Sequence, residues 1–287
     1  MKIYAQMDIV RKYFWAGIIV VLILSLSTVG STRANSLKDT KLTSVQKSWS
    51  WMIAQSALNL LSPSVQNGLE TKDNYIIHPP TGKLTAPIIA QQVVTYKSFT
   101  AFQLAIQQHS VPQGTKWILL DLEKWQFTPL VEQKDPLKYY SLASNYSRRY
   151  GYELIAAPGL SLFPGNFKNK LEYISRSNFY GKLAKYAAVV EVQSQSQEFT
   201  ETNFNELVGT VLDQVRATNE VTSVFAGLST NPPAGVATTP QLLNLINSVP
   251  SGLSGFWMNI PSPGAMCPTC NAQSPSVADA MFQTLGV

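Results

Sequence analysis

The residues best suited to chemistry are two carboxylates at the end of an apolar run. Residues 117–125 read WILLDLEKW, which places Asp121 and Glu123 one leucine apart. Because side chains alternate faces along a β-strand, both carboxylates would point the same way, with backbones roughly 6.6 Å apart. Acids at the end of a buried strand are costly unless they are paired or used, and paired carboxylates are typical of glycoside cleavage. The alternatives are that Asp121 caps a loop or pairs with a lysine, and that Glu123 pairs with a base such as Arg148.

Segments typical of strands alternate with segments of helical periodicity along most of the chain. We predict strands over residues 75–78, 92–96, 117–123, 153–157, 187–195, 223–228 and 255–260. We predict helices over residues 45–61, 99–108, 137–150, 171–185, 204–218, 240–248 and 276–285. Asp135 and Pro136 would cap and open the helix at 137–150, and Gly151 would follow its end.

This alternation predicts an α/β fold, a (β/α)8 barrel of the TIM type. Near-continuous apolar strands separated by helices are typical of a parallel sheet, and the number of strands fits a closed barrel better than an open sheet. The eighth strand would lie in residues 83–90, or the barrel would be irregular on its N-terminal side. No internal repeat or second domain is visible, so we predict one domain over residues 44–287.

Polar residues at the strand ends are the candidate site residues, because the active site of such a barrel forms at the C-terminal ends of its strands. Glu191, Gln193 and Gln195 share one face of EVQSQ by alternation and could bind sugar hydroxyls. The glutamines could instead form a solvated rim. The other candidates for substrate binding are His78, Tyr96, Trp257 and Asn259; the alternatives are a core role for Trp257 and a loop role for His78.

Five segments resemble, in the family's own order, the plant-type members of glycoside hydrolase family 18, the class III chitinases and their lectin relatives. WILLDLE is similar to the acid-bearing strand that ends in Asp-x-Glu, and LIAAPGLSLFPG to the strand after it. VVEVQSQ resembles the family's strand with a Gln-x-Tyr pair, and VFAGLSTNPPAG resembles its Gly-Leu-Pro strand and loop. GFWMNIP resembles the family's last strand. Two aspartates of the family motif are replaced by Lys116 and Leu119, and its tyrosine falls at Gln195.

The resemblance implies hydrolysis of an N-acetylglucosamine-containing or related polysaccharide without a cofactor. Glu123 would be the general acid, and Asp121 would orient and stabilise the substrate's own acetamido group as it attacks the anomeric carbon. Gln193 and Gln195 would bind the acetamido group or ring hydroxyls. Trp257 would form an apolar floor under the sugar, with Asn259 beside it.

Other functions stay open beside the hydrolase. The departures from the family motif favour a carbohydrate-binding barrel without catalysis. A hydrolase acting on peptidoglycan is a third possibility, since the muramidases of family 25 also carry Asp-x-Glu on a strand, although their other strands find no match. A metal-dependent phosphodiesterase is disfavoured because the chain has two histidines.

The N-terminus predicts export. Lys2, Arg11 and Lys12 precede a largely apolar run over residues 13–29, so residues 1–34 are expected to be a signal peptide or an uncleaved membrane anchor. Residues 35–43 would be a polar linker. The protein would then be secreted, or held on the outer face of a membrane through this segment alone. The charge of +5 partly reflects the same segment, and no basic stripe interleaved with aromatics follows it, which excludes nucleic acid as a partner.

Cys267 and Cys270, in the sequence CPTC, are the only cysteines of the chain. In an exported protein this spacing favours a short disulfide, with a pair of surface thiols as the alternative. Zinc would need two more ligands, and the histidines, His78 and His109, are distant in sequence. A thioredoxin-like site would place the motif after an early strand, whereas it lies here in a late Pro/Gly/Ser-rich loop. No metal is therefore expected.

Overall fold

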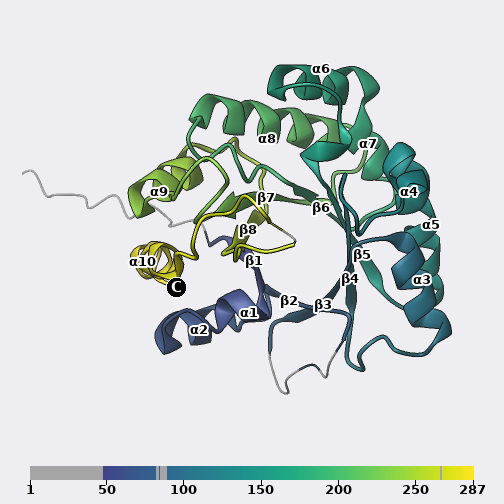
Figure 1. Cartoon of the computed structure of the whole chain (residues 1–287), viewed down its shortest axis with the longest axis horizontal. Helices are drawn as coiled ribbons and strands as arrows, with labels where there is room; N and C mark the ends of the chain where they lie inside the picture. Colours follow the sequence, from purple (N-terminus) through teal and green to yellow (C-terminus); the bar gives the residue numbers. More distant parts are fainter. Residues whose placement is uncertain (1–47, 82–83, 85–88, 266) are drawn as a thin grey trace, which may run out of the picture. The chain divides into compact units, whose positions relative to one another are not determined.

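Eight parallel strands close into a barrel in chain order, so the predicted (β/α)8 architecture is confirmed (Figure 1). The computed structural model describes residues 48–81, 84, 89–265 and 267–287. Each strand pairs in parallel with the next, and the last pairs with the first. The strands are β1 (Ser50–Ala54), β2 (Tyr75–His78), β3 (Gln91–Tyr96), β4 (Trp117–Leu122), β5 (Glu153–Pro158), β6 (Val189–Val192), β7 (Ser223–Ser229) and β8 (Gly255–Asn259).

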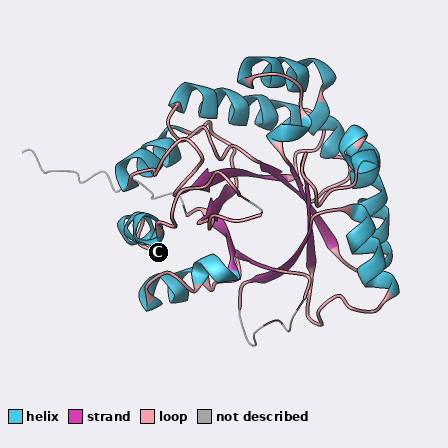
Figure 2. Cartoon of the chain, in the orientation of Figure 1, coloured by secondary structure: helices cyan, strands magenta, loops and turns pink. Residues whose placement is uncertain are grey.

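The described helices lie outside the ring of strands (Figure 2). They are α1 (Gln55–Leu58), α2 (Pro63–Leu69), α3 (Phe99–Gln107), α4 (Leu130–Lys134), α5 (Pro136–Arg149), α6 (Phe167–Ser177), α7 (Phe179–Leu183), α8 (Glu201–Arg216), α9 (Thr239–Ser248) and α10 (Pro275–Thr284). Asp135 caps α5 by accepting a hydrogen bond from the Lys138 amide, with Pro136 at the first position. Gly151 follows with a φ of 78°, so the predicted punctuation of this helix is confirmed.

The prediction of one helix over residues 45–61 is wrong, because its centre is the strand β1. Trp51 and Ile53 face the helices, and Met52 faces the barrel interior; all three are buried. A strand buried on both faces is apolar at every position, and a short run of this kind is equally typical of a helix. The eighth strand is therefore β1 and does not come from residues 83–90, most of which lie outside the described part.

Two other predicted boundaries differ from the structure. The helix predicted over 171–185 is divided into α6 and α7 at Asn178, whose left-handed backbone (φ 49°, ψ 46°) ends the first helix. The strand predicted over 187–195 stops at Val192, and the residues after it form turns.

Alternation along the strands sorts the core into two layers. One layer fills the barrel and contains Met52, Ile77, Val93, Leu119, Ile155, Ala157, Val189, Phe225 and Trp257. At the N-terminal end of the barrel, Tyr75 packs edge to face against Trp117 and Phe225, with ring centroids 5.3 and 5.5 Å away. The other layer lies between strands and helices. Aromatic rings thus fill the N-terminal end, and polar strand residues are left for the opposite end.

The predicted signal peptide or anchor (1–34) and the linker (35–43) lie outside the described residues. Among the helices of the described ranges, none combines the length and hydropathy that a membrane span requires.

Candidate active site

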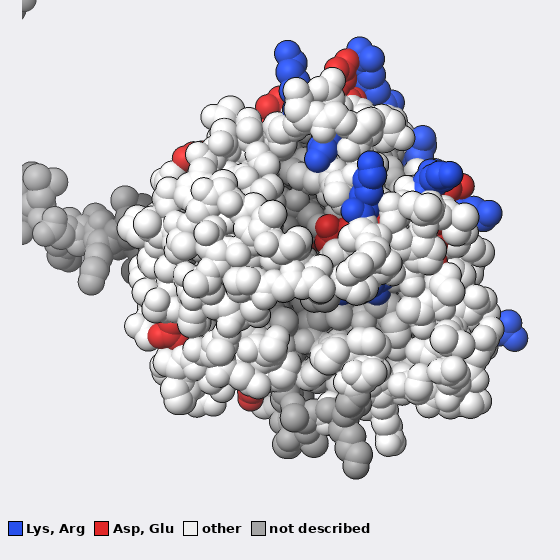
Figure 3. Space-filling view, viewed as in Figure 1, with Lys and Arg blue, Asp and Glu red and all other residues white. Residues whose placement is uncertain are grey.

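Asp121 and Glu123 lie at the C-terminal end of β4. Leu119 belongs to the layer inside the barrel, so alternation turns Asp121 inward as well. Asp121 is buried, and Glu123, one residue beyond the strand, is partly exposed. Figure 3 shows a hollow over the barrel, with acidic atoms at its edge beside basic ones.

Both carboxylate oxygens of Asp121 have partners. The ammonium group of Lys97, which follows β3, lies 2.5 Å from Oδ2. The amide of Gln193 donates to Oδ1 over 2.7 Å, and to the carbonyl of Ala157 over 3.3 Å. The structure thus shows the lysine pairing that the sequence left as an alternative for Asp121. Because the Lys97 side chain is about a quarter exposed, at 24%, the pair is not sealed from solvent.

Glu123 forms no ion pair within the described ranges and contacts the backbone of the next strand's loop. A side chain at Gly159 would bring its Cβ to 2.5 Å from Cγ of Glu123, so this glycine makes room for the acid. Burial, and then the charge of Asp121, raise the pKa of Glu123 to about 7, while Lys97 and the Gln193 amide act in the opposite direction. A carboxyl group with a pKa near neutrality holds a proton that it can donate.

Glu191 is a third carboxyl group close to this pair. It points inward from β6, is fully buried, and neither of its oxygens has a hydrogen-bonding partner in good geometry among the described residues. Burial is the largest cause that raises its pKa well above the usual value, followed by the charges of Asp121 and Glu123; the Gln195 side chain opposes the rise. Glu191 therefore influences the site electrostatically and does not reach the surface where a substrate would bind.

Other residues predicted for the site also gather at this end of the barrel. Gln193 binds Asp121, and Gln195 lies against Gly227 of β7, where a side chain would collide with its amide. Trp257 faces the interior from β8 and is buried in the layer that fills the barrel, as its core alternative has it, with no described partner for its indole N–H. Asn259 ends β8 and is partly exposed.

Tyr96 and His78 are not brought to the carboxylates. Tyr96 faces the helices and packs on Phe102, with ring centroids 5.3 Å apart. The imidazole of His78 is buried and bonded to Gln92 over 2.7 Å. Both residues alternate with interior positions of their strands, Val93 of β3 among them. Their positions at strand ends indicate a role in the site, but both side chains point away from the barrel interior, so neither lies at the carboxylates.

Sequence reasoning missed Lys97, Thr128 and Trp125. Lys97 is the partner of Asp121. The buried hydroxyl of Thr128 accepts hydrogen bonds from the indole of Trp125 and from the amide of Glu123. Their positions in the sequence could have indicated two of them. Lys97 directly follows a predicted strand, and Trp125 continues the alternate spacing of Asp121 and Glu123.

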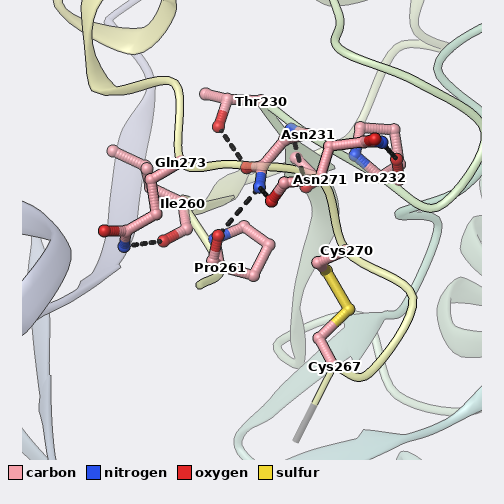
Figure 4. Close-up of a disulfide and its surroundings, with 10 residues drawn as sticks. Thr230, Asn231, Pro232, Ile260, Pro261, Cys267, Cys270, Asn271 and Gln273 are labelled. Carbon is pink, nitrogen blue, oxygen red and sulfur yellow. Dashed lines mark hydrogen bonds between the residues drawn. A yellow bond between two sulfur atoms is a disulfide. The ribbon is translucent and has the colours of Figure 1, made fainter. Parts of the chain in front are cut away.

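The two cysteines are joined in a disulfide in the loop between β8 and α10 (Figure 4). The buried amide of Asn231 holds this loop at both ends by donating to the carbonyls of Pro261 and Asn271, over 2.8 and 2.9 Å. These contacts support a structural role for the disulfide. Within the described part of the chain, no group of three or more His, Cys, Asp or Glu side chains could hold a metal ion.

No protein-family model matches the chain, and no curated protein matches its sequence. Among solved structures, it is similar to triosephosphate isomerase from Bartonella henselae, at 11% identity and a TM-score of 0.40, over 76% of this chain and 94% of that one. It is also similar to a GH128 (subgroup III) curdlan-specific exo-beta-1,3-glucanase from Blastomyces gilchristii, solved with glucose. That match has 12% identity and a TM-score of 0.43 over 82% and 96% of the two chains. Likenesses this low carry no argument about activity.

Proposed function

We propose that the protein is a glycoside hydrolase acting on an N-acetylglucosamine-containing or related polysaccharide. The observation that carries the proposal is a partly exposed acid, Glu123, whose pKa is raised to about 7 beside the ion-paired Asp121. Two carboxyl groups in environments that differ this much are suited to the separate roles of proton donor and anion. The proposal includes residues 1–34 as an export signal or membrane anchor, which would put the activity outside the cell.

In the proposed reaction, Glu123 protonates the glycosidic oxygen as the bond to the leaving sugar breaks. The substrate's acetamido oxygen attacks the anomeric carbon, and Asp121 orients that group and stabilises the positive charge it acquires. Lys97 and Gln193 hold Asp121 in place. A water molecule then attacks the anomeric carbon and opens the cyclic intermediate. Glu123, now deprotonated, takes a proton from that water.

The test is release of reducing ends from chito-oligosaccharides by the wild-type protein and by Glu123→Gln. We expect the variant to lose hydrolysis and to keep its fold and its sugar binding. Glu153→Gln is a matched control, because Glu153 is an exposed glutamate at the N-terminal start of β5. Full activity in Glu123→Gln would exclude the proposed acid.

A carbohydrate-binding barrel without catalysis is the second candidate. Both oxygens of Asp121 are already occupied by Lys97 and Gln193, which leaves this carboxylate less free to meet a substrate. Calorimetric titration with chito-oligosaccharides beside the reducing-end assay separates the candidates, since heat without product indicates binding alone.

A further inference from the structure

An exposed apolar surface follows the two carboxylates along the chain. Trp125 and Phe127 meet edge to face, with ring centroids 5.3 Å apart, and Phe127 is 37% exposed. Leu130 and Val131, at the start of α4, are also exposed. Trp125 itself is partly buried. We call these four residues, which lie within seven positions of the chain, the aromatic ridge. Several large apolar side chains exposed together mark a binding surface more often than single ones do.

One buried hydroxyl couples the ridge to the candidate active site. Thr128 Oγ1 accepts from the indole N–H of Trp125 over 2.8 Å and from the amide of Glu123 over 3.3 Å, and it donates to the carbonyl of Lys97 over 2.6 Å. A hydroxyl group has one donor and two acceptor positions, so all of its capacity is used. The indole is thereby fixed relative to both the proposed acid and the residue that pairs with Asp121.

Lys97 provides a second connection. Its ammonium group contacts Asp121 and also lies over the Trp125 ring, 5.0 Å from the centroid. The amide of Gln133 binds the carbonyls of Trp125 and Thr128 over 2.8 and 2.7 Å, which holds the loop in shape. A surface that is already ordered loses less conformational entropy when a ligand binds to it.

We infer that the aromatic ridge binds sugar units of the same glycan whose bond lies at Glu123, an inference that rests on the proposed function. The faces of pyranose rings carry C–H groups that pack on aromatic side chains, while hydroxyl groups at the ring edge stay in water. Trp125 shares the Thr128 hydroxyl with the Glu123 amide, so sugar units next to the cleaved bond would meet the ridge. A glycan that occupies the ridge as well as the site at Glu123 is an oligosaccharide or polysaccharide with sugar units beyond the bond that is cleaved. The contacts of Trp125 with Lys97 and Thr128 join the ridge to the candidate active site, which favours this occupant over an unrelated protein.

Calorimetric titration in the Glu123→Gln background, where turnover is prevented, tests the inference. The probes are chitobiose and chitohexaose, with cellobiose and cellohexaose as a series that lacks the acetamido group. We expect the longer sugar to bind more tightly. Phe127→Ala should weaken binding of the longer sugar by about fivefold and affect binding of the shorter sugar less. Phe127→Tyr, which keeps the ring, should retain the affinity.

Tyr150→Ala is the matched control. Tyr150 is an aromatic residue of similar exposure, 47%, at the C-terminal end of α5, and thus at the end of the barrel opposite the carboxylates. This change should alter neither affinity. Thermal unfolding of each variant checks that the fold is kept.

The outcomes separate the inference from the proposed function. If the long sugars bind and Phe127→Ala binds them as tightly as its parent, or weakens short and long sugars equally, the ridge inference is wrong and the proposed function stands. If no sugar of either series binds any variant, both are wrong. If gel filtration shows a dimer that Phe127→Ala converts to a monomer, the ridge is a protein interface and the inference is overturned.

Discussion

Lys97 and Asp121 form an ion pair across the ends of neighbouring strands, with Nζ and Oδ2 2.5 Å apart. The pair explains how a buried carboxylate is accommodated inside the barrel, since an unpaired charge there would be strongly unfavourable. It also leaves Glu123 as the acid without an ionic partner among the described residues.

The first prediction concerns this pair. Lys97→Met leaves the Asp121 carboxylate buried without its cation, and we expect the free energy of unfolding to fall by about 1–3 kcal/mol. Urea unfolding measures the loss. Lys124→Met removes an exposed lysine nearby and should change stability little. Equal stability of the Lys97→Met variant and the wild type would contradict this account of Asp121.

A second prediction follows from the raised pKa of Glu123. Its pKa is about 7 in the folded protein against an ordinary 4.5, so between these pH values the unfolded chain binds fewer protons at this position. Glu123 is therefore expected to make stability fall as pH rises through that window. Glu123→Gln lacks this contribution. As pH rises from 4.5 to 7, the melting temperature of the variant should therefore increase relative to that of the wild type. A constant difference would contradict the raised pKa.

The third prediction concerns Glu191, whose buried oxygens make no hydrogen bond of good geometry with the described residues. Glu191→Leu replaces a buried polar group with an apolar one of similar size, and we expect the free energy of unfolding to rise by roughly 1–2 kcal/mol. Glu191→Gln keeps the unpartnered polar atoms and should gain little. A lower melting temperature for Glu191→Leu would mean that the carboxyl group has a stabilising partner.

Gly159→Ala is the fourth test. The new Cβ would lie 2.5 Å from Cγ of Glu123, so the acid must move, although the backbone at residue 159 suits any amino acid. We expect hydrolysis to fall by at least about tenfold, since small misplacements of catalytic groups are costly. Gly264→Ala, where a Cβ meets nothing within 4 Å, is the control. Unchanged activity in Gly159→Ala would remove Glu123 from the reaction.

The barrel could be predicted from the sequence because seven of its strands are apolar runs bounded by turn residues and helices. β1 could not, because a strand of five residues buried on both sides has no alternation that distinguishes it from a helix. The same lack of a reference for strand faces limits how well the site could be predicted. Alternation shows that Asp121 and Glu123 share a face, but a residue known to point inward is needed to tell which face that is. For Tyr96 and His78 the sequence shows only that they end strands, and the structure turns them away from the barrel interior.

The partners of the acids could not be predicted, because they come from other strands and loops. Lys97 is distant from Asp121 in sequence, and Thr128 joins three residues only after the loop has folded. The raised pKa of Glu123 likewise depends on burial, which the sequence does not give at the end of a strand.

The most direct measurement compares two substrates of different leaving-group ability in the Glu123→Gln variant. With an unactivated chito-oligosaccharide, loss of the general acid should lower the hydrolysis rate by roughly 100-fold or more. A 4-nitrophenyl glycoside of the same sugar has a leaving group that needs no proton, so most of its hydrolysis should remain. Wild-type hydrolysis of the unactivated sugar should also decline above about pH 7, as Glu123 loses its proton. Equal loss on both substrates, or no loss on either, would contradict Glu123 as the acid.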